Sequence, residues 1–156
     1  TRNLLGKNLC RKYPNGRVER LRIFETEAYD GPNDKACHAA KGMTPRTRIM
    51  YAPGGYWYVY LCYGVHWMLN LVTGPKNYPA AVLLRGAGEV VGPGRLTRHL
   101  EITRKENTQR ASRPSGLWIE DDGFEVANSQ IERTPRIGIA NAEEWIDAPY
   151  RFVWQS

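Results

Sequence analysis

Residues 24–70 read FETEAYDGPNDKACHAAKGMTPRTRIMYAPGGYWYVYLCYGVHWMLN, and they carry the clearest structural signals of the chain. The stretch opens inside a β-rich run from Val18 to Tyr29, which predicts one long strand. Two further β-rich runs, Tyr56–Tyr63 and Val65–Val72, have only Gly64 between them. They predict a tight hairpin with Tyr63 at its tip.

Further elements are predicted on both sides of this stretch. Asn15-Gly16 separates two β-rich runs, which is a hairpin signal. Leu96 and Leu100 are four residues apart after Gly92-Pro93-Gly94, as one face of a helix requires. The remaining predicted strands are Ala80–Arg85, Leu117–Ile119, Arg136–Ile139 and Tyr150–Trp154.

Strands outnumber helices, neighbouring strands are joined by short turns, and no β-α-β alternation is present. We therefore expect an α+β fold: a single compact domain, residues 1–156, on a curved, mainly antiparallel β-sheet with a protruding β-hairpin. A chain of 156 residues can bury one core without metal or disulfide support. It begins at Thr1 rather than Met, so we expect a few N-terminal residues to be missing.

The charge distribution points to a polyanionic partner. The net charge is +6 and the isoelectric point is about 9.4. Between Arg95 and Arg113 there are six Arg or Lys residues against two Glu, whereas acidic residues cluster later in the chain. A solvated surface helix is the alternative explanation of this basic segment. Mean hydropathy is −0.55 and no apolar run approaches the roughly 20 residues that cross a bilayer, so no membrane association is expected.

The three cysteines, Cys10, Cys37 and Cys62, are odd in number and show no CxxC spacing. This pattern predicts a reducing compartment and argues against a zinc site or a disulfide framework. We interpret each cysteine as a small apolar residue of the core.

Two groups of side chains could carry chemistry. Glu25 and Glu27 are two residues apart and therefore share one face of the predicted strand, but periodicity does not choose between them as a general base. Tyr60 shares a strand face with Tyr56 and Tyr58, which also fits an ordinary sheet core, and Tyr63 has the opposite parity. Asn70 interrupts an apolar run and needs a polar partner if it is buried.

The ETEAY unit, His38 after a Gly-Pro turn, the aromatic ladder that stops at Tyr63-Gly64, and the LN pair ending at Asn70 occur in a linked order. In this order they resemble the alkyladenine (3-methyladenine, methylpurine) DNA glycosylase family, and the resemblance covers most of the chain. It implies a monofunctional enzyme of base excision repair that flips damaged purines out of double-stranded DNA and excises them hydrolytically. The substrates implied are alkylated or deaminated purines: 3-methyladenine, 7-methylguanine, hypoxanthine and ethenoadenine.

The resemblance also implies no metal and no cofactor, a monomer, and a cytoplasmic or nucleoid location in a prokaryote or a nuclear one in a eukaryote. No lyase step is expected, because no lysine lies inside the motif to form a Schiff base. One departure concerns the connector after Arg85, which is longer in the family. Here only Gly86 to Val91 precede the Gly-Pro-Gly turn, so the connector is either naturally short or incomplete in this sequence.

Individual roles follow from the resemblance. Glu27 is the expected general base and Glu25 a structural residue. The damaged base is expected to stack in a pocket, and Tyr63 to intercalate in its place. The expected pocket residues are Tyr29, His38, Tyr60 and Asn70. Arg85 is the expected phosphate-positioning residue, with Arg95, Arg46 and Arg48 as weaker candidates for phosphate contacts.

Two other functions fit parts of the sequence. A nucleic-acid-binding module without chemistry would explain the basic segment alone. A metal-dependent nuclease would draw its ligands from nearby acidic and histidine residues, although their spacing matches no tight metal motif. Those candidate ligands are Glu25, Glu27, Asp30, Asp34 and His38.

Overall fold

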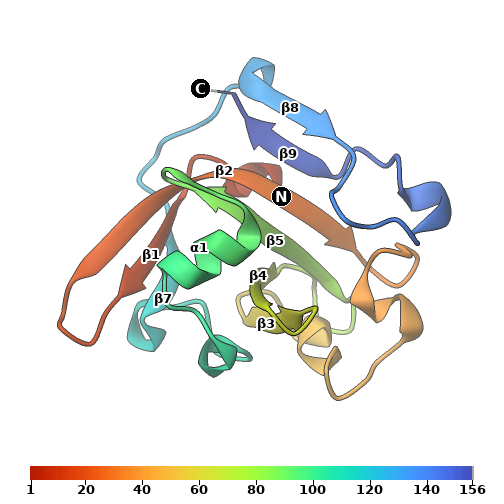
Figure 1. The fold of residues 1–156 in the computed structure, drawn as a ribbon, viewed down its shortest axis with the longest axis horizontal. Coiled ribbons are helices and arrows are strands. Elements are labelled where there is room, and N and C mark those ends of the chain that lie inside the picture. The colour runs from red at the N-terminus through yellow and green to blue at the C-terminus, as the bar shows by residue number, and fades with distance from the viewer. Residues whose placement is uncertain (156) are drawn as a thin grey trace.

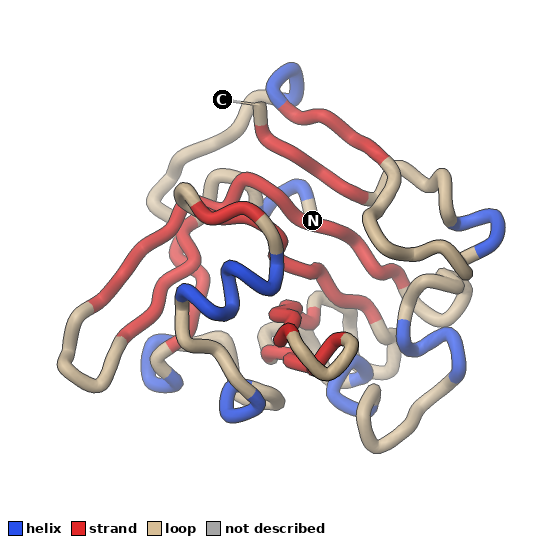
Figure 2. The backbone as a smooth tube through the Cα atoms, viewed as in Figure 1, coloured by secondary structure: helices blue, strands red, loops and turns tan. Residues whose placement is uncertain are grey.

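The computed structural model describes residues 1–155, whose strands form one large sheet with short helical segments around it (Figures 1 and 2). The strands are β1 (Asn8–Lys12), β2 (Val18–Asp30), β3 (Trp57–Cys62), β4 (His66–Val72), β5 (Ala80–Ala87), β6 (Val90–Val91), β7 (Leu117–Glu120), β8 (Ile131–Thr134) and β9 (Arg151–Trp154). The α-helix is α1 (Pro93–His99). The 3-10 helices are η1 (Arg2–Leu4), η2 (His38–Lys41), η3 (Arg48–Tyr51), η4 (Arg104–Glu106), η5 (Arg113–Ser115), η6 (Asn128–Gln130) and η7 (Glu143–Trp145). Within residues 1–155, no helix is both long and apolar enough to span a membrane.

The long strand β2 organises the sheet. Its first half pairs with β1, and its second half pairs with β5 on one edge and β9 on the other. The strand order is β3-β4-β5-β2-β1-β7, with β8 attached through β9, and the pairings of the described strands are antiparallel. The expected α+β fold on a mainly antiparallel sheet is confirmed.

The sheet packs a different core on each face. Alternate residues of β3 and β4, such as Trp57 and Leu69, pack with Leu96 and Leu100 of α1. The intervening residues face the other way, where Tyr58 packs with residues of the segment that carries η2 and η3. Because successive side chains of a strand point to opposite faces, one set in β3 and β4 lies in the main core and the other in a smaller, aromatic core.

β2 and β5 do not pair regularly throughout. The register shifts on both sides of Glu25, next to Arg85 of β5. Gly86 gives room to the Phe24 ring at this point: a Cβ atom there would lie 2.4 Å from the ring, so a larger residue would force the ring to move. Irregular pairing of this kind is common beside active sites, where it redirects a side chain. Here it accompanies the approach of Arg85 to the glutamates of β2.

Two details differ from the prediction. Arg136–Ile139 is not a strand; the strand is Ile131–Thr134, which pairs with β9. The reason is that Arg136 turns its side chain into the interior, and the Ile137 N–H donates to a carboxylate rather than to a neighbouring strand. The hairpin loop is also longer than predicted, spanning residues 63–65 between Cys62 and His66.

The short connector after Arg85 forms a hairpin of its own. β5 turns back into β6 with Gly86 opposite Val91 and Ala87 opposite Val90. Gly88 occupies the turn with φ of 61°, a conformation that glycine adopts without steric cost. The chain thus passes from β5 to α1 without an extended loop.

Candidate active site

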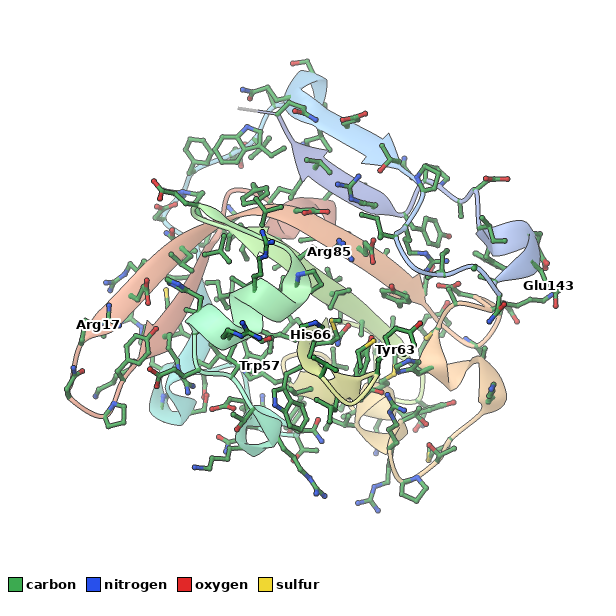
Figure 3. The ribbon with its side chains drawn as sticks, viewed as in Figure 1. Arg17, Trp57, Tyr63, His66, Arg85 and Glu143 are labelled. Carbon is green, nitrogen blue, oxygen red and sulfur yellow. The ribbon has the colours of Figure 1, made fainter. Side chains whose placement is uncertain are left out.

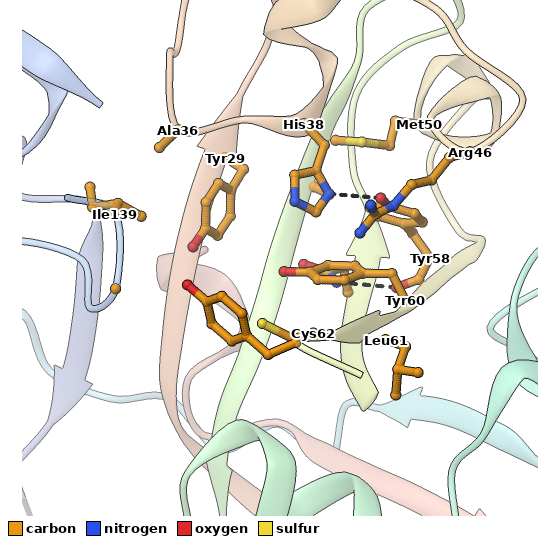
Figure 4. A pocket seen from close by; sticks show the side chains of 14 residues that line it. Tyr29, Ala36, His38, Arg46, Met50, Tyr58, Tyr60, Leu61, Cys62 and Ile139 are labelled. Carbon is orange, nitrogen blue, oxygen red and sulfur yellow. Dashed lines mark hydrogen bonds between the residues drawn. The ribbon is translucent and has the colours of Figure 1, made fainter. Parts of the chain in front are cut away.

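A cavity of about 340 Å³ opens between the β3–β4 hairpin, the end of β2 and the segment after β8 (Figure 4). Its lining includes the four side chains predicted for a base pocket, Tyr29, His38, Tyr60 and Asn70. They come from separate parts of the chain. The remaining lining residues are Ala36, Arg46, Met50, Tyr58, Leu61, Cys62, Tyr63, Ala81, Gly138 and Ile139. The cavity lies within the size range, about 300–1,000 Å³, of sites for small organic groups.

The aromatic rings of the pocket support each other. The His38 ring meets Tyr60 edge-on with ring centroids 4.5 Å apart, and Tyr58 lies 5.3 Å from Tyr60. His38 Nδ1 lies 2.8 Å from the Tyr58 hydroxyl, and the Arg46 guanidinium lies 5.0 Å from the Tyr60 ring centre. Side chains from η2, β3 and the loop at residues 42–47 thus hold the ring planes in place, as Figure 4 shows.

The imidazole of His38 is neutral near pH 7. Burial, together with the nearby cations Arg46 and Lys41, lowers the pKa of His38 from 6.5 to about 4. A neutral ring carries one N–H and one acceptor nitrogen, and its Nδ1 is engaged by Tyr58. Its Nε2 has no described hydrogen-bond partner, so a residue that lines the cavity keeps one hydrogen-bonding nitrogen and carries no positive charge.

This lowered pKa predicts a pH-dependent difference in stability. The unfolded chain binds a proton on His38 below about pH 6.5, but the folded chain does so only near pH 4, so His38 makes folding less favourable as pH falls through that window. Replacing His38 with Asn keeps a polar atom near Tyr58 and removes the titration. The free energy of unfolding, measured with urea at pH 7, 6 and 5, should fall less in His38→Asn than in the wild type. Parallel pH curves for the two proteins would contradict this assignment.

Asn70 is buried, and its side chain has polar partners on the sheet. Its amide nitrogen donates to the backbone carbonyl of Tyr58 at 3.1 Å. Across the sheet Asn70 pairs with Leu83, and Leu83 pairs with Glu27, so the three residues form one row on the pocket face. The sheet register therefore places the candidate base-reading amide and the candidate general base two strands apart.

Glu27 is completely enclosed, with an exposed side-chain fraction of 0%. One carboxylate oxygen accepts the Ile137 N–H at 2.8 Å and lies 3.5 Å from Arg85, and the other accepts the Tyr29 hydroxyl at 3.0 Å. Burial raises the pKa of Glu27, and Arg85, the Ile137 N–H and the Tyr29 hydroxyl oppose that rise. A carboxylate tuned upward by burial at the edge of a cavity is suited to take a proton from water.

Glu25 has a different environment, although both glutamates face Arg85 as their spacing predicts. One oxygen of Glu25 accepts from Arg85 at 3.0 Å and from Arg151 at 2.6 Å. Arg151 also donates to the hydroxyl of Thr134 at 3.0 Å, which ties β8 and β9 to the same cluster. Two arginines thus hold Glu25 in an ion-pair network, a structural arrangement that leaves Glu27 as the carboxylate beside the pocket.

Tyr63 lies at the hairpin tip with an exposed fraction of 93%, and Figure 3 shows it projecting from the β3–β4 turn. Its backbone has φ of 49°, a left-handed conformation that is strained for a residue with a side chain. An exposed tyrosine in a strained conformation adds little to the stability of the fold. Such positions persist where the side chain has a function outside the folded core.

The predicted phosphate-binding arginines lie in two kinds of environment. Arg85 is largely buried against Glu25 and Glu27 and does not project into solvent. Arg46, Arg48 and Arg95 are exposed, and no ion pair to them is found among residues 1–155. Gly94, in the first turn of α1, packs against the His66 ring, where a Cβ atom would lie 2.8 Å from the ring. The Gly-Pro-Gly turn therefore fits the helix against the hairpin.

Sequence reasoning missed three residues of the site. Arg136 forms a buried ion pair with Asp34, Arg151 binds Glu25, and Ile137 supplies the N–H that binds Glu27. Each lies more than 100 positions from its partner, so no local pattern marks it. A sequence signal was present in Arg136 and in Arg151, because each is a charged residue inside a run predicted to be a strand.

No group of three or more His, Cys, Asp or Glu side chains in residues 1–155 is arranged to hold a metal ion. The ligands considered for a nuclease are separated: Glu25 pairs with Arg85 and Arg151, and Asp34 pairs with Arg136. The geometry therefore does not favour the nuclease hypothesis.

Comparisons with known proteins all indicate one family. The model of the methylpurine-DNA glycosylase family matches residues 1–91 and 89–156. A protein named "Putative 3-methyladenine DNA glycosylase" from Methanocella arvoryzae is 45% identical, covering 97% of this chain and 84% of its own. Proteins with the same name from Psychrobacter cryohalolentis and Chlamydia felis are 40% and 38% identical, covering 97% of this chain and 84% and 87% of theirs.

The matches are consistent with a connector after Arg85 that is shorter in this chain than in the family. The two segments of the family match overlap at residues 89–91, which are Glu89 and strand β6. The alignments with the first two relatives run over 172 and 184 residues, more than the 156 of this chain, so the relatives carry additional residues. With an aromatic cavity, a buried glutamate beside it and matches along its whole length, the chain belongs to the methylpurine-DNA glycosylase family.

Proposed function

We propose that this protein is a monofunctional DNA glycosylase that flips alkylated or deaminated purines out of duplex DNA and removes them by hydrolysis. The substrates proposed are 3-methyladenine, 7-methylguanine, hypoxanthine and ethenoadenine, and the protein is proposed to act as a monomer without cofactor. The observation that carries the proposal is the position of Glu27, buried beside an aromatic cavity of a size suited to a single base.

The chemical step assigned to Glu27 follows from its environment. As the glycosidic bond breaks, positive charge develops on the sugar, and water attacks C1′. A carboxylate beside this centre stabilises the charge and accepts the proton of the water. One oxygen of Glu27 accepts the Ile137 N–H and lies 3.5 Å from Arg85, whereas the other accepts the Tyr29 hydroxyl alone, and we assign its second lone pair to the water. The described lining residues of the cavity include no lysine that could form a Schiff base, which supports hydrolysis without a lyase step.

The cavity offers aromatic surfaces to a planar base. Tyr29, His38 and Tyr60 offer ring faces and edges, and stacking of this kind contributes about 1–3 kcal/mol per base. Because His38 is neutral near pH 7, a cationic base such as 7-methylguanine meets no imidazolium charge from it. The buried amide of Asn70 is proposed to distinguish damaged purines from guanine.

Exposed basic residues lie on both sides of Tyr63. Arg95 and Arg98 lie on α1, which packs against β4, and Arg46 and Arg48 lie in the segment that covers the pocket. This placement supports a DNA duplex lying across the hairpin, with phosphates on either side and Tyr63 entering the minor groove.

The basic face predicts a steep dependence of DNA affinity on salt. Log affinity for undamaged duplex should fall against log salt with a slope of about −0.9 per phosphate contacted. Arg95→Ala and Arg48→Ala should each reduce the magnitude of that slope by about 1. Arg17→Ala is the matched control, because Arg17 is an exposed arginine at the β1–β2 turn, away from the hairpin (Figure 3). A slope that is unchanged in the first two variants, or changed equally in the control, would contradict the proposed face.

The proposed function is tested with duplex oligonucleotides that carry hypoxanthine, ethenoadenine or 7-methylguanine. The expected result is release of the base, with strand cleavage at the abasic site appearing only after alkaline treatment. Cleavage without alkali would contradict the monofunctional assignment. Binding to all duplexes without release of any base would identify a nucleic-acid-binding module instead.

A further inference from the structure

Arg136 is the most deeply buried cation of the site region, and it joins the late part of the chain to the end of β2 and the loop that follows it. Its guanidinium donates to both carboxylate oxygens of Asp34, at 2.6 and 2.8 Å, and both side chains have an exposed fraction of 0%. It also donates to the backbone carbonyl of Ala28 in β2 at 2.8 Å. The same group lies 4.8 Å from the ring centre of Tyr29 and 5.2 Å from that of Tyr150.

The partner carboxylate shapes the loop that leads to His38. The two oxygens of Asp34 accept the backbone N–H groups of Asp30 and Ala36, each at 3.1 Å. The carbonyl of Asp34 accepts from Cys37, which immediately precedes His38. The loop that carries a pocket histidine is therefore fastened to the residue that Arg136 holds.

The residues that follow Arg136 reach the reaction site directly. The Ile137 N–H donates to Glu27 at 2.8 Å, and Gly138 and Ile139 line the cavity. Because Ile137 is covalently next to Arg136, the anchor on Asp34 sets where its N–H lies. We propose that Arg136 is a positioning residue for excision: its ion pair with Asp34 holds the Ile137 N–H against the Glu27 carboxylate. This inference rests on the proposed function of Glu27.

The main effect of the Arg136–Asp34 ion pair is on orientation and not on overall stability. A buried ion pair contributes little net stability compared with apolar packing, because both charges lose their hydration. Its specific effect here is directional, since the bidentate fork of arginine fixes both distance and orientation. Lysine at this position keeps the charge but lacks the fork. The segment that carries Ile137 should therefore stay attached to Asp34, but its orientation should be less fixed.

The charged and titratable groups around Glu27 define the expected signature. Arg85 faces it from β5, and Glu25 and Tyr29 face it from β2. Tyr60 and Arg136 lie near enough that the charge of Glu27 raises the pKa of each. The Ile137 N–H lowers the pKa of Glu27 by binding the carboxylate form. Loosening it should raise that pKa further, so the protonated form persists to higher pH.

The test compares Arg136→Lys with the wild type and with Arg133→Lys, a matched control on the exposed part of β8. Two readouts are used: the ¹³C carboxyl titration of Glu27, assigned by its loss in Glu27→Gln, and the single-turnover excision of hypoxanthine from duplex DNA against pH. In Arg136→Lys the titration and the acid limb of the rate should both move to higher pH. Excision near pH 6.5 should fall about tenfold, as loss of one hydrogen bond to a charged group implies. Affinity for undamaged duplex should stay within about twofold.

Asp34→Asn is the second variant, and it should move both readouts in the same direction. An unchanged Glu27 titration in Arg136→Lys would overturn the inference even if excision falls. If both variants melt below the assay temperature while the Arg133→Lys control does not, the pair is a fold-forming element alone, and the inference is equally overturned. A wild-type chain that shows the titration but excises no base would instead overturn the proposed function and, with it, any role of Arg136 in excision.

Discussion

Replacing Glu27 with glutamine is expected to slow base excision by about 10²–10⁴-fold and to leave DNA binding intact. Glutamine keeps the shape of the side chain, and its carbonyl oxygen can still accept the Ile137 N–H. It cannot take a proton from water, and it offers no negative charge to the developing cation on the sugar. Single-turnover excision and equilibrium binding on the same hypoxanthine duplex measure the two effects separately.

Glu25→Gln is the matched control. It should lower the melting temperature more than Glu27→Gln does and slow excision less. Glu27 is a desolvated carboxylate whose pKa is raised, so its replacement should not lower the melting temperature substantially. Glu25 is held by Arg85 and Arg151, so its replacement should lower the melting temperature, because Arg151 loses its charge partner and Arg85 keeps only the more distant Glu27. Full activity in Glu27→Gln together with an inactive, folded Glu25→Gln would reverse the assignment of the base.

Removing the ring of Tyr63 is expected to reduce excision of hypoxanthine from a stable base pair by about 100-fold, since flipping costs a few kcal/mol and the vacated stack is left unfilled. The loss should be much smaller when the damaged base is mismatched or in a single-base bulge, because such a base is already partly unstacked. Single-turnover excision by Tyr63→Ala from paired and mismatched duplexes measures this difference. Equal losses on the two duplexes would show that Tyr63 is not a wedge.

The stability of the Tyr63 variants gives an independent check. The side chain is 93% exposed, so Tyr63→Ala should leave the melting temperature nearly unchanged. Tyr63→Gly should keep or raise it, because glycine adopts the observed φ of 49° without strain. A stable but flipping-deficient glycine variant would show that the strained tip is maintained for DNA. A large drop in melting temperature in either variant would identify Tyr63 as part of the packed fold.

Several features could be predicted from the sequence because they depend on local periodicity. In a strand, successive side chains alternate, so Glu25 and Glu27 had to share a face, as did Tyr58 and Tyr60. The Asn15-Gly16 turn follows from the backbone preferences of its residues, and Gly64, with φ of 69°, marks the β3–β4 turn. The strands β2, β3, β4 and β5 lie close to where these patterns place them.

The late part of the chain was predicted less well. Ile131–Thr134 contains adjacent charged residues, Glu132 and Arg133, that are both exposed on an edge strand, so no alternation of apolar and polar residues marks it. Arg136–Ile139 resembles a strand in composition. Its backbone instead serves the interior, because the Arg136 side chain and the Ile137 N–H find their partners on β2 and the loop that follows.

By itself, the sequence determined which residues are available to the site and which of them share a strand face. Only the tertiary structure decided how their charges are matched: Glu25 meets Arg85 and Arg151, Asp34 meets Arg136, and Glu27 is left buried with a raised pKa. The physical reason is that burial and ion pairing depend on bringing together residues that are 60, 102 and 126 positions apart in these three pairs. The chemical difference between two glutamates two positions apart is therefore a property of the fold, and no local pattern contains it.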